Sequence, residues 1–193
     1  MDEASVFLQS NKDLLPVILQ IQESQWTQPV PPEMSWKPGQ TLRNIVNYHV
    51  YDDAWVPDVL AGKTAAQVGD RWESLLTTTS TLREYEKYNL IAQESVAAFV
   101  EFDRTVHLSY GDFTAREYLQ HITLFRGFRV YDLSRFLGIK ADFSELLVQG
   151  LWDIVFPKAK ELRAMHVIGE EIAVPADAPL LQRLLGLTGR SPA

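Results

Sequence analysis

The amino-acid sequence predicts an all-α fold, an up-and-down four-helix bundle with short extended segments and a small C-terminal helix. Three observations favour this fold. Apolar residues recur at helical spacing in long stretches, short polar or proline-containing pieces separate these stretches, and no internal repeat is visible. The length of 193 residues is typical of one domain, so residues 1–193 are expected to form a single helical-bundle domain.

The first helix is expected within residues 1–23, where apolar side chains follow a helical spacing. Proline fits best in the first turn of a helix, so Pro16 predicts a helix that starts near Asp13 or kinks there. Residues 27–39 are rich in proline and are expected to form a loop.

The second helix is expected over residues 42–62. His49 and Asp53 share one helical stripe with Leu42, Ile45 and Val46, so both are expected to point inward. Gly62 is expected to end this helix, and Pro57 marks a candidate break.

The third helix is expected from about Leu82 to Phe102. The polar, threonine-rich connection over residues 63–81 is expected to be a loop. Residues 104–112 alternate apolar and polar side chains, which predicts a short extended segment that ends in a turn at Gly111 and Asp112.

The fourth helix is expected from Ala115 to Leu137. Thr114 and Glu117 have the spacing of a capping box, and Gly138 suits a left-handed helix cap. Its inward stripe is expected to contain Tyr118, His121, Ile122, Phe125, Arg129, Asp132 and Phe136.

The C-terminal part is expected to contain two further helical pieces. One covers about residues 143–165 and is interrupted or shortened at Pro157. The other is the small helix around Leu180 to Leu185.

The composition indicates a soluble globular protein, with 46% hydrophobic and 22% charged residues. A formal net charge of -7 and the lack of a dense basic run disfavour a nucleic-acid partner. The sequence contains no cysteine, which excludes disulfides, thiolate metal sites and a cysteine nucleophile. No apolar run approaches the ~20 residues of a membrane span and no basic leader begins the chain, so a cytoplasmic protein without a membrane partner is expected.

Bundle interiors can hold metal sites made of histidine and carboxylate side chains on facing helices. His49, His121 and Asp53 on the predicted inward stripes would make a two-histidine, one-carboxylate set. The alternative is that each is an ordinary core residue with a hydrogen-bonded neighbour. The many aromatic side chains likewise predict either a pocket for an apolar ligand or plain core filling; among them are Trp36, Tyr48, Trp55, Trp72, Phe125 and Phe128.

Three separated segments resemble one known family. They are NYHVYDDAWVPDVLAGKT (residues 47–64), FDRTVHLSYGDFTAREYL (102–119) and DAPLLQRLLGLTGR (177–190). Together they resemble the DinB/YfiT-like superfamily, in its branch related to the mycothiol-dependent maleylpyruvate isomerases. The resemblance runs from about Trp36 to Pro192.

The resemblance implies a four-helix bundle with a divalent-metal site. Its ligands are a histidine on the second helix and, on a later helix, an acidic residue followed four positions later by a histidine. His49 matches the first ligand, whereas Phe125 and Arg129 occupy the other two positions. A guanidinium has no lone pair for a cation, so the inherited site is expected to be degenerate. Arg129 is then expected to pair with Asp53 or Asp132, because an unpaired buried cation is costly.

The expected function is the binding of a small anionic or thiol-derived ligand, since a guanidinium suits anionic groups. The expected pocket comprises His49, Asp53, His121, Phe125, Arg129 and Asp132. One alternative is a metal-free, thiol-dependent isomerase or transferase with His49 as general base and Arg129 as electrostatic stabiliser. Another is a zinc or nickel enzyme with a relocated site made of His49, Asp53 and His121. No resident cofactor is expected, although a mycothiol-type thiol stays an alternative. The sequence leaves open whether the protein forms a homodimer.

Overall fold

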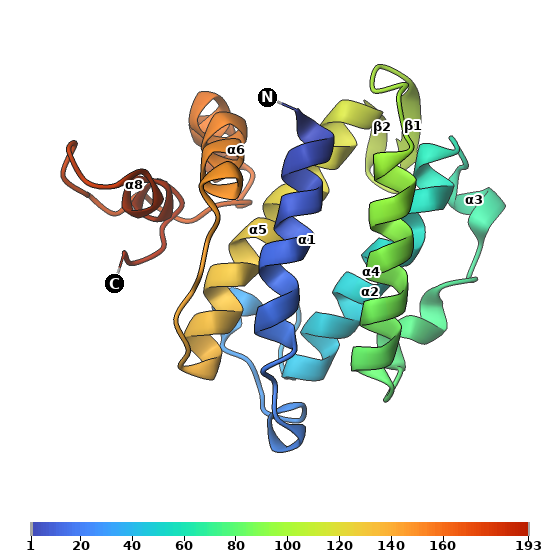
Figure 1. Cartoon of the computed structure of the whole chain (residues 1–193), viewed down its shortest axis with the longest axis horizontal. Coiled ribbons are helices and arrows are strands. Elements are labelled where there is room, and N and C mark those ends of the chain that lie inside the picture. Colours follow the sequence, from blue (N-terminus) through green and yellow to red (C-terminus); the bar gives the residue numbers. More distant parts are fainter. Residues whose placement is uncertain (1, 193) are drawn as a thin grey trace.

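The computed structural model describes residues 2–192 and is mostly helical, with one small sheet (Figure 1). Its α-helices are α1 (Glu3–Ile18), α2 (Leu42–Leu60), α3 (Ala65–Val68), α4 (Thr81–Ala97), α5 (Ala115–Leu137), α6 (Glu145–Val155), α7 (Ala159–Ala164) and α8 (Leu180–Leu187). Strands β1 (Thr105–Leu108) and β2 (Gly111–Thr114) form an antiparallel hairpin. The prediction of a mainly helical fold is therefore confirmed.

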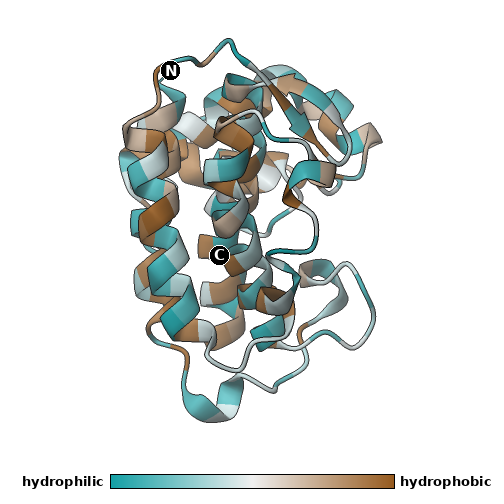
Figure 2. Cartoon of the chain, turned by 90° about the vertical axis from the view of Figure 1, so that its right-hand side faces the viewer, coloured by the Kyte–Doolittle hydropathy of each residue, from teal (hydrophilic) through white to brown (hydrophobic). Residues whose placement is uncertain are grey.

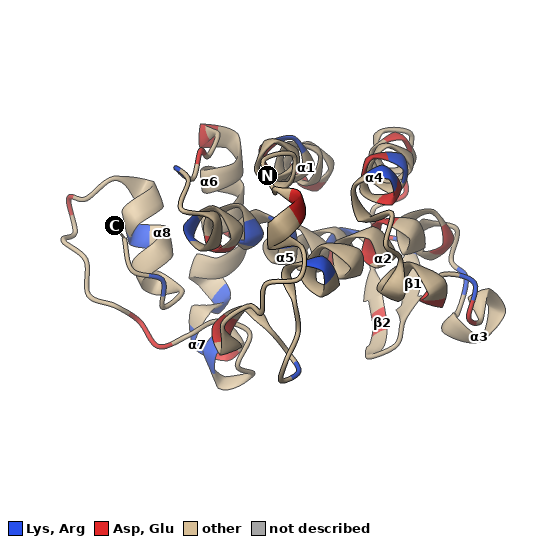
Figure 3. Cartoon of the chain, turned by 90° about the horizontal axis from the view of Figure 1, so that it is seen from below, with Lys and Arg blue, Asp and Glu red and all other residues tan. Residues whose placement is uncertain are grey.

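The longest helices lie in two layers, with α1 and α4 in one and α5 and α2 in the other (Figure 3). α1 packs along α5, and α2 packs along α4. Contacts of α1 with α4 and of α2 with α5 join these two pairs. α6 packs against α1 and α5, and α8 packs on α6. α5 therefore has α1, α2 and α6 as neighbours and is covered from several directions.

Side-chain caps fix where the two site-bearing helices begin. The Thr41 hydroxyl accepts a hydrogen bond from the backbone N–H of Asn44 at the start of α2. The predicted capping box of α5 is confirmed, because the Glu117 carboxylate accepts from the Thr114 backbone N–H at 2.9 Å. Gly138 ends α5 with φ 68°, the left-handed conformation that glycine adopts without strain.

The first helix begins earlier than predicted. α1 starts at Glu3 rather than near Asp13, and Pro16 lies in its last turn. A proline removes one backbone donor and crowds the preceding turn. Only two residues of α1 follow Pro16, so the chain tolerates this loss at the helix end.

The connection after α2 is also more ordered than predicted. The structure places α3 within residues 63–81, because Thr64 and Gln67 form a capping box. α4 then ends at Ala97 instead of near Phe102. The chain turns directly after it.

The hairpin differs from the prediction in the position of its turn. Leu108 pairs with Gly111, so the reversal lies at Ser109 and Tyr110, and Gly111 begins β2. Gly111 has φ 142°, which side-chain-bearing residues rarely adopt. The glycine therefore permits the start of the second strand.

Two prolines were candidate interruptions, and only one of them breaks a helix. α2 continues through Pro57 to Leu60. Pro157 does interrupt its segment, since a 3₁₀ turn separates α6 from α7 as predicted. The small helix predicted around Leu180 is confirmed as α8.

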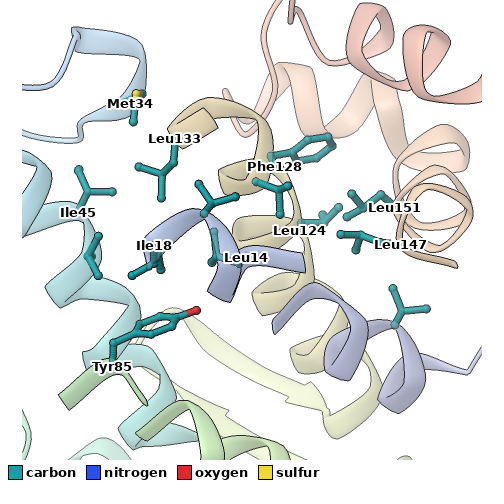
Figure 4. Packing of buried hydrophobic residues seen from close by; sticks show 14 of the residues in the cluster. Leu14, Ile18, Met34, Ile45, Tyr85, Leu124, Phe128, Leu133, Leu147 and Leu151 are labelled. Atoms are coloured by element: carbon teal, nitrogen blue, oxygen red, sulfur yellow. The ribbon is translucent and has the colours of Figure 1, made fainter. Parts of the chain in front are cut away.

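Buried apolar side chains form two clusters. The larger one joins α1, α2, α5 and α6 (Figure 4) and contains Leu14, Ile18, Ile45, Leu124, Leu133 and Leu151. The smaller one lies toward the hairpin and contains Phe7, Val56, Val96, Val106 and Leu119. Each cluster contains residues of α1, α2, α4 and α5, so both clusters stabilise the packing of the same four helices.

Charged and hydrophilic residues recur on the outer sides of the helices (Figures 2 and 3). None of the helices within residues 2–192 is long and apolar enough to cross a bilayer.

Gly150 of α6 permits the close approach of α1. A Cβ added at Gly150 would lie 2.4 Å from Cγ1 of Val6. Gly150→Ala should lower the free energy of unfolding by about 1–3 kcal/mol, because a helical valine cannot rotate away. In a Val6→Ala background the same substitution should be neutral or stabilising, since alanine favours a helix by about 1 kcal/mol. Urea unfolding of the four proteins measures both effects, and equal effects in the two backgrounds would contradict this contact.

Candidate functional site

A layer of polar side chains crosses the interior, with one residue from each of the four longest helices. They are Asn11 of α1, Asp53 of α2, Asn89 of α4 and Arg126 of α5, and all are buried. Arg126 forms an ion pair with Asp53. The Asn89 side-chain amide donates to Asp53 Oδ2 at 3.3 Å and also to the side-chain oxygen of Asn11. Residues of both apolar clusters flank the layer on these helices.

The charges within this polar layer balance. Burial raises the pKa of Asp53, while the Arg126 guanidinium and the Asn89 amide oppose that effect. Desolvation also opposes the charge of Arg126, but the carboxylates of Asp53 and Asp52 outweigh it and raise the pKa of Arg126. Because a guanidinium keeps its proton in proteins, an ionised Asp53 is the state that leaves no unbalanced charge in the pair.

Arg129 is buried as predicted, and of the two carboxylates expected to pair with it, Asp53 and Asp132, only Asp132 does so. Its nearest carboxylate is Asp132, with 3.9 Å between Nη1 and Oδ2. Asp132 is held mainly by Arg190 of the C-terminal tail, through bonds of 2.9 and 3.0 Å. Asp53 is not available to Arg129, because Arg126 occupies it. The Arg129 guanidinium instead lies over the ring of Phe125, 5.2 Å from its centroid.

His49 is wholly buried, as its place on the α2 stripe predicted. Its ring stacks on Phe125 with 4.5 Å between the centroids. Burial, followed by the charges of Arg129 and Arg126, holds the pKa of His49 well below its usual value. Within the described residues neither ring nitrogen has a hydrogen-bond partner. His49 is therefore a neutral ring packed in the interior.

The residues at the metal position that the sequence resemblance implies do not fit a divalent cation. His49 and Phe125 are stacked, and the permanently charged Arg129 lies over the same Phe125 ring. The relocated set of His49, Asp53 and His121 is not brought together either: Asp53 is engaged by Arg126. Among residues 2–192 no three histidine or acidic side chains are grouped so as to hold a metal ion.

A cavity of about 530 Å³ opens between α2, α5 and the hairpin. Much of its wall is aromatic; Trp36, Tyr48, Tyr51, Trp55, Tyr110, Tyr118 and Phe125 all contribute. Its lining also includes an aspartate and two histidines, namely Asp52, His107 and His121. The cavity is thus an apolar space with few polar groups.

One face of α2 forms a wall of this cavity. Tyr48, Tyr51, Asp52 and Trp55 recur at helical spacing and all line it. The ring centroids of Tyr48 and Tyr51 are 5.8 Å apart, and those of Tyr51 and Trp55 are 6.0 Å apart. Asp52 therefore lies inside an aromatic stripe, whereas the next residue, Asp53, points into the core.

The hairpin and α5 form the facing wall. The Tyr110 hydroxyl lies 3.3 Å from Nδ1 of His121. Burial, followed by the charge of Lys158, lowers the pKa of His121, and Glu117 opposes this shift. His107 also lines the cavity, and its Nδ1 lies 2.7 Å from the exposed carboxylate of Asp112.

Asp52 is the one acidic side chain among the residues that line this cavity. It is half-buried, and no hydrogen bond or ion pair within residues 2–192 engages its carboxylate. Burial raises the pKa of Asp52 to about 7; Arg126 lowers it and Asp53 adds to the rise. A desolvated carboxylate without a partner is the chemical feature that distinguishes this cavity.

The predicted pocket residues fall into three different places. His121 and Phe125 line the aromatic cavity, while His49, Asp53 and Arg129 lie in the interior. Asp132 lines a second, polar cavity of about 660 Å³ beside the C-terminal tail.

The sequence interpretation missed Asp52 and Arg126. Arg126 shares a helical stripe with Leu119, Val130 and Leu133, which is a visible signal of burial. Asp52 could have been found from the tyrosines and tryptophan around it on α2, since these make one aromatic face.

In comparisons with known proteins, no family model, curated protein or solved structure matches the chain. The inference of function therefore depends on the geometry and charge of the cavity.

The buried ion pair predicts strong non-additivity between two substitutions. Asp53→Leu leaves Arg126 without a counter-ion and Arg126→Met leaves Asp53 without one, so each should cost about 3–5 kcal/mol of unfolding free energy. The double variant should cost less than the sum, because no buried charge is left. Urea unfolding measures all three, and Asp52→Asn serves as the matched control that should not destabilise comparably. Strictly additive losses would show that the pair does not act as a unit.

Proposed function

We propose that the protein binds a small organic molecule with a flat, apolar part in the aromatic cavity between α2, α5 and the hairpin. The observation that carries this proposal is the wall of seven aromatic side chains around about 530 Å³. This volume lies within the range of small-molecule pockets, which are mostly apolar and have few polar groups. Aromatic faces also favour stacking with flat ligands.

The proposal includes the family that the sequence resembles. A DinB/YfiT-like four-helix bundle is supported by the packing of α1 on α5 and of α2 on α4. Loss of the inherited metal function is supported by the stacked His49 and Phe125 and by the buried charge of Arg129. Binding then takes place in the cavity beside that position, without a step through a metal.

The proposed ligand differs from the anionic one expected at Arg129. Arg129 does not line the aromatic cavity, and the described residues that line it include neither lysine nor arginine. Anion binding commonly uses such cationic groups. The anionic or thiol-derived ligand and the thiol-dependent reaction stay predictions.

Indole provides a neutral aromatic probe for this proposal. Calorimetric titration should show that indole binds the full chain. Ala65→Trp places a large side chain at the cavity lining and should weaken indole binding by about tenfold or more, equivalent to ~1.4 kcal/mol. Ala66→Trp is the matched control, because Ala66 is equally exposed but does not line the cavity. Failure of indole to bind, or equal weakening in both variants, would contradict the proposal.

A further inference from the structure

We infer that the ligand of the aromatic cavity is an organic cation whose ammonium group lies against Asp52 and the surrounding aromatic rings. This inference rests on the proposed function, because it specifies the chemistry of the ligand that the cavity takes. It is carried by three observations: the unpartnered carboxylate, the rings that flank it, and the lack of lysine and arginine among the described residues of the lining.

The Asp52 carboxyl group has no cationic partner of its own among the described residues. Arg126 lies close enough to influence it, yet the Arg126 guanidinium is paired with Asp53. Within the described chain Asp52 has no hydrogen bond or ion pair of its own. Burying a carboxylate without a partner costs free energy, and a cationic ligand would remove that cost.

The rings around Asp52 suit a cation. Tyr48, Tyr51 and Trp55 flank it on α2, and Tyr110 lies across the cavity. The face of an aromatic ring attracts an ammonium group within about 6 Å, most strongly when water is displaced. An alkylated ammonium has an apolar surface, so it loses less hydration than a metal ion would on entering such a space.

The tyrosine hydroxyls of the cavity do not supply a negative charge that could bind the cation in place of Asp52. Burial and the nearby Asp52 raise the pKa of both Tyr48 and Tyr110 to about 12. Both rings are therefore neutral at physiological pH. Asp52 is left as the anionic group of the cavity wall.

The cavity is less suited to the other charge types. Burial keeps His121 predominantly neutral, so it supplies no fixed positive charge for an anion. A neutral ligand could occupy the space but would leave Asp52 desolvated and unpaired. A ligand with one ammonium group matches both the charge and the apolar walls.

The direct test compares two probes of the same shape. Phenyltrimethylammonium and tert-butylbenzene differ in a single central atom, which carries the positive charge in the former. The full-length protein should bind phenyltrimethylammonium at least about tenfold more tightly, because only the cation can interact with the carboxylate and the ring faces. Equal or weaker binding of the cation would overturn the inference.

Asp52→Asn tests the carboxylate itself. The substitution keeps the shape of the side chain and removes its charge. It should weaken phenyltrimethylammonium binding by about tenfold. Asp70→Asn is the matched control, because it makes the same change of net charge at an exposed position away from the cavity. Equal effects of the two substitutions on cation binding would overturn the assignment.

The pH dependence of wild-type binding gives a second readout that needs no variant. Phenyltrimethylammonium has no titratable proton, and it should prefer ionised Asp52. Its affinity should therefore rise through about pH 7, the pKa of Asp52 in the free protein, and level off above it. A flat profile would contradict a role for the carboxylate.

Other groups around Asp52 could add to this pH dependence. Those on α2, α5 and the hairpin are Tyr48, Tyr51, Asp53, Tyr118, His121, Arg126, His107 and Tyr110. Protonated His121 would repel the cation at low pH, so its effect on the affinity has the same direction as that of Asp52. Asp52→Asn retains both histidines, so the part of the profile that this variant abolishes belongs to Asp52.

The two proposals fail in different ways. If indole binds but the cation binds no better than tert-butylbenzene, the cavity is a binding site and only the cationic ligand is wrong. If neither indole nor phenyltrimethylammonium binds, both the site and the cationic ligand are wrong.

Discussion

The ion pair between Asp53 and Arg126, with its amide partners Asn11 and Asn89, is the constraint on which the rest of the fold depends. Apolar clusters above and below it can stabilise helices in several registers, because apolar contacts have little directionality. A buried charge pair has one satisfactory arrangement, in which both ions meet their partners. Each of the four longest helices contributes one residue to this layer, so satisfying it sets the register of all four.

The cavity depends on the same constraint through two adjacent residues of α2. A helix turns by about 100° per residue, so when Asp53 points into the core, Asp52 must point to a neighbouring face. That face carries the tyrosines and the tryptophan of the cavity wall. Arg126 also favours the ionised form of both aspartates, because its guanidinium opposes the rise that burial causes in the pKa of each. Structural and ligand-facing carboxylates are thereby kept one residue apart.

The sequence predicted best those features that local spacing determines. The capping box at Thr114, the cap at Gly138 and the burial of His49 and Arg129 all follow from patterns a few residues long. The sequence left open whether Asp53 or Asp132 pairs with Arg129, because another cation on the same helix, Arg126, takes Asp53 only once α2 and α5 are packed. The sequence also does not show which of two stripes of α5 faces the core, because several neighbouring helices pack against this helix.

The hairpin has a consequence for how this protein could diversify. It joins α4 to α5, and its two strands pair only with each other. Its turn nevertheless supplies Ser109 and Tyr110 to the cavity wall. Insertions at an exposed turn are tolerated far better than changes in a buried layer. The shape of the cavity could therefore change through this one loop while the interior stayed the same.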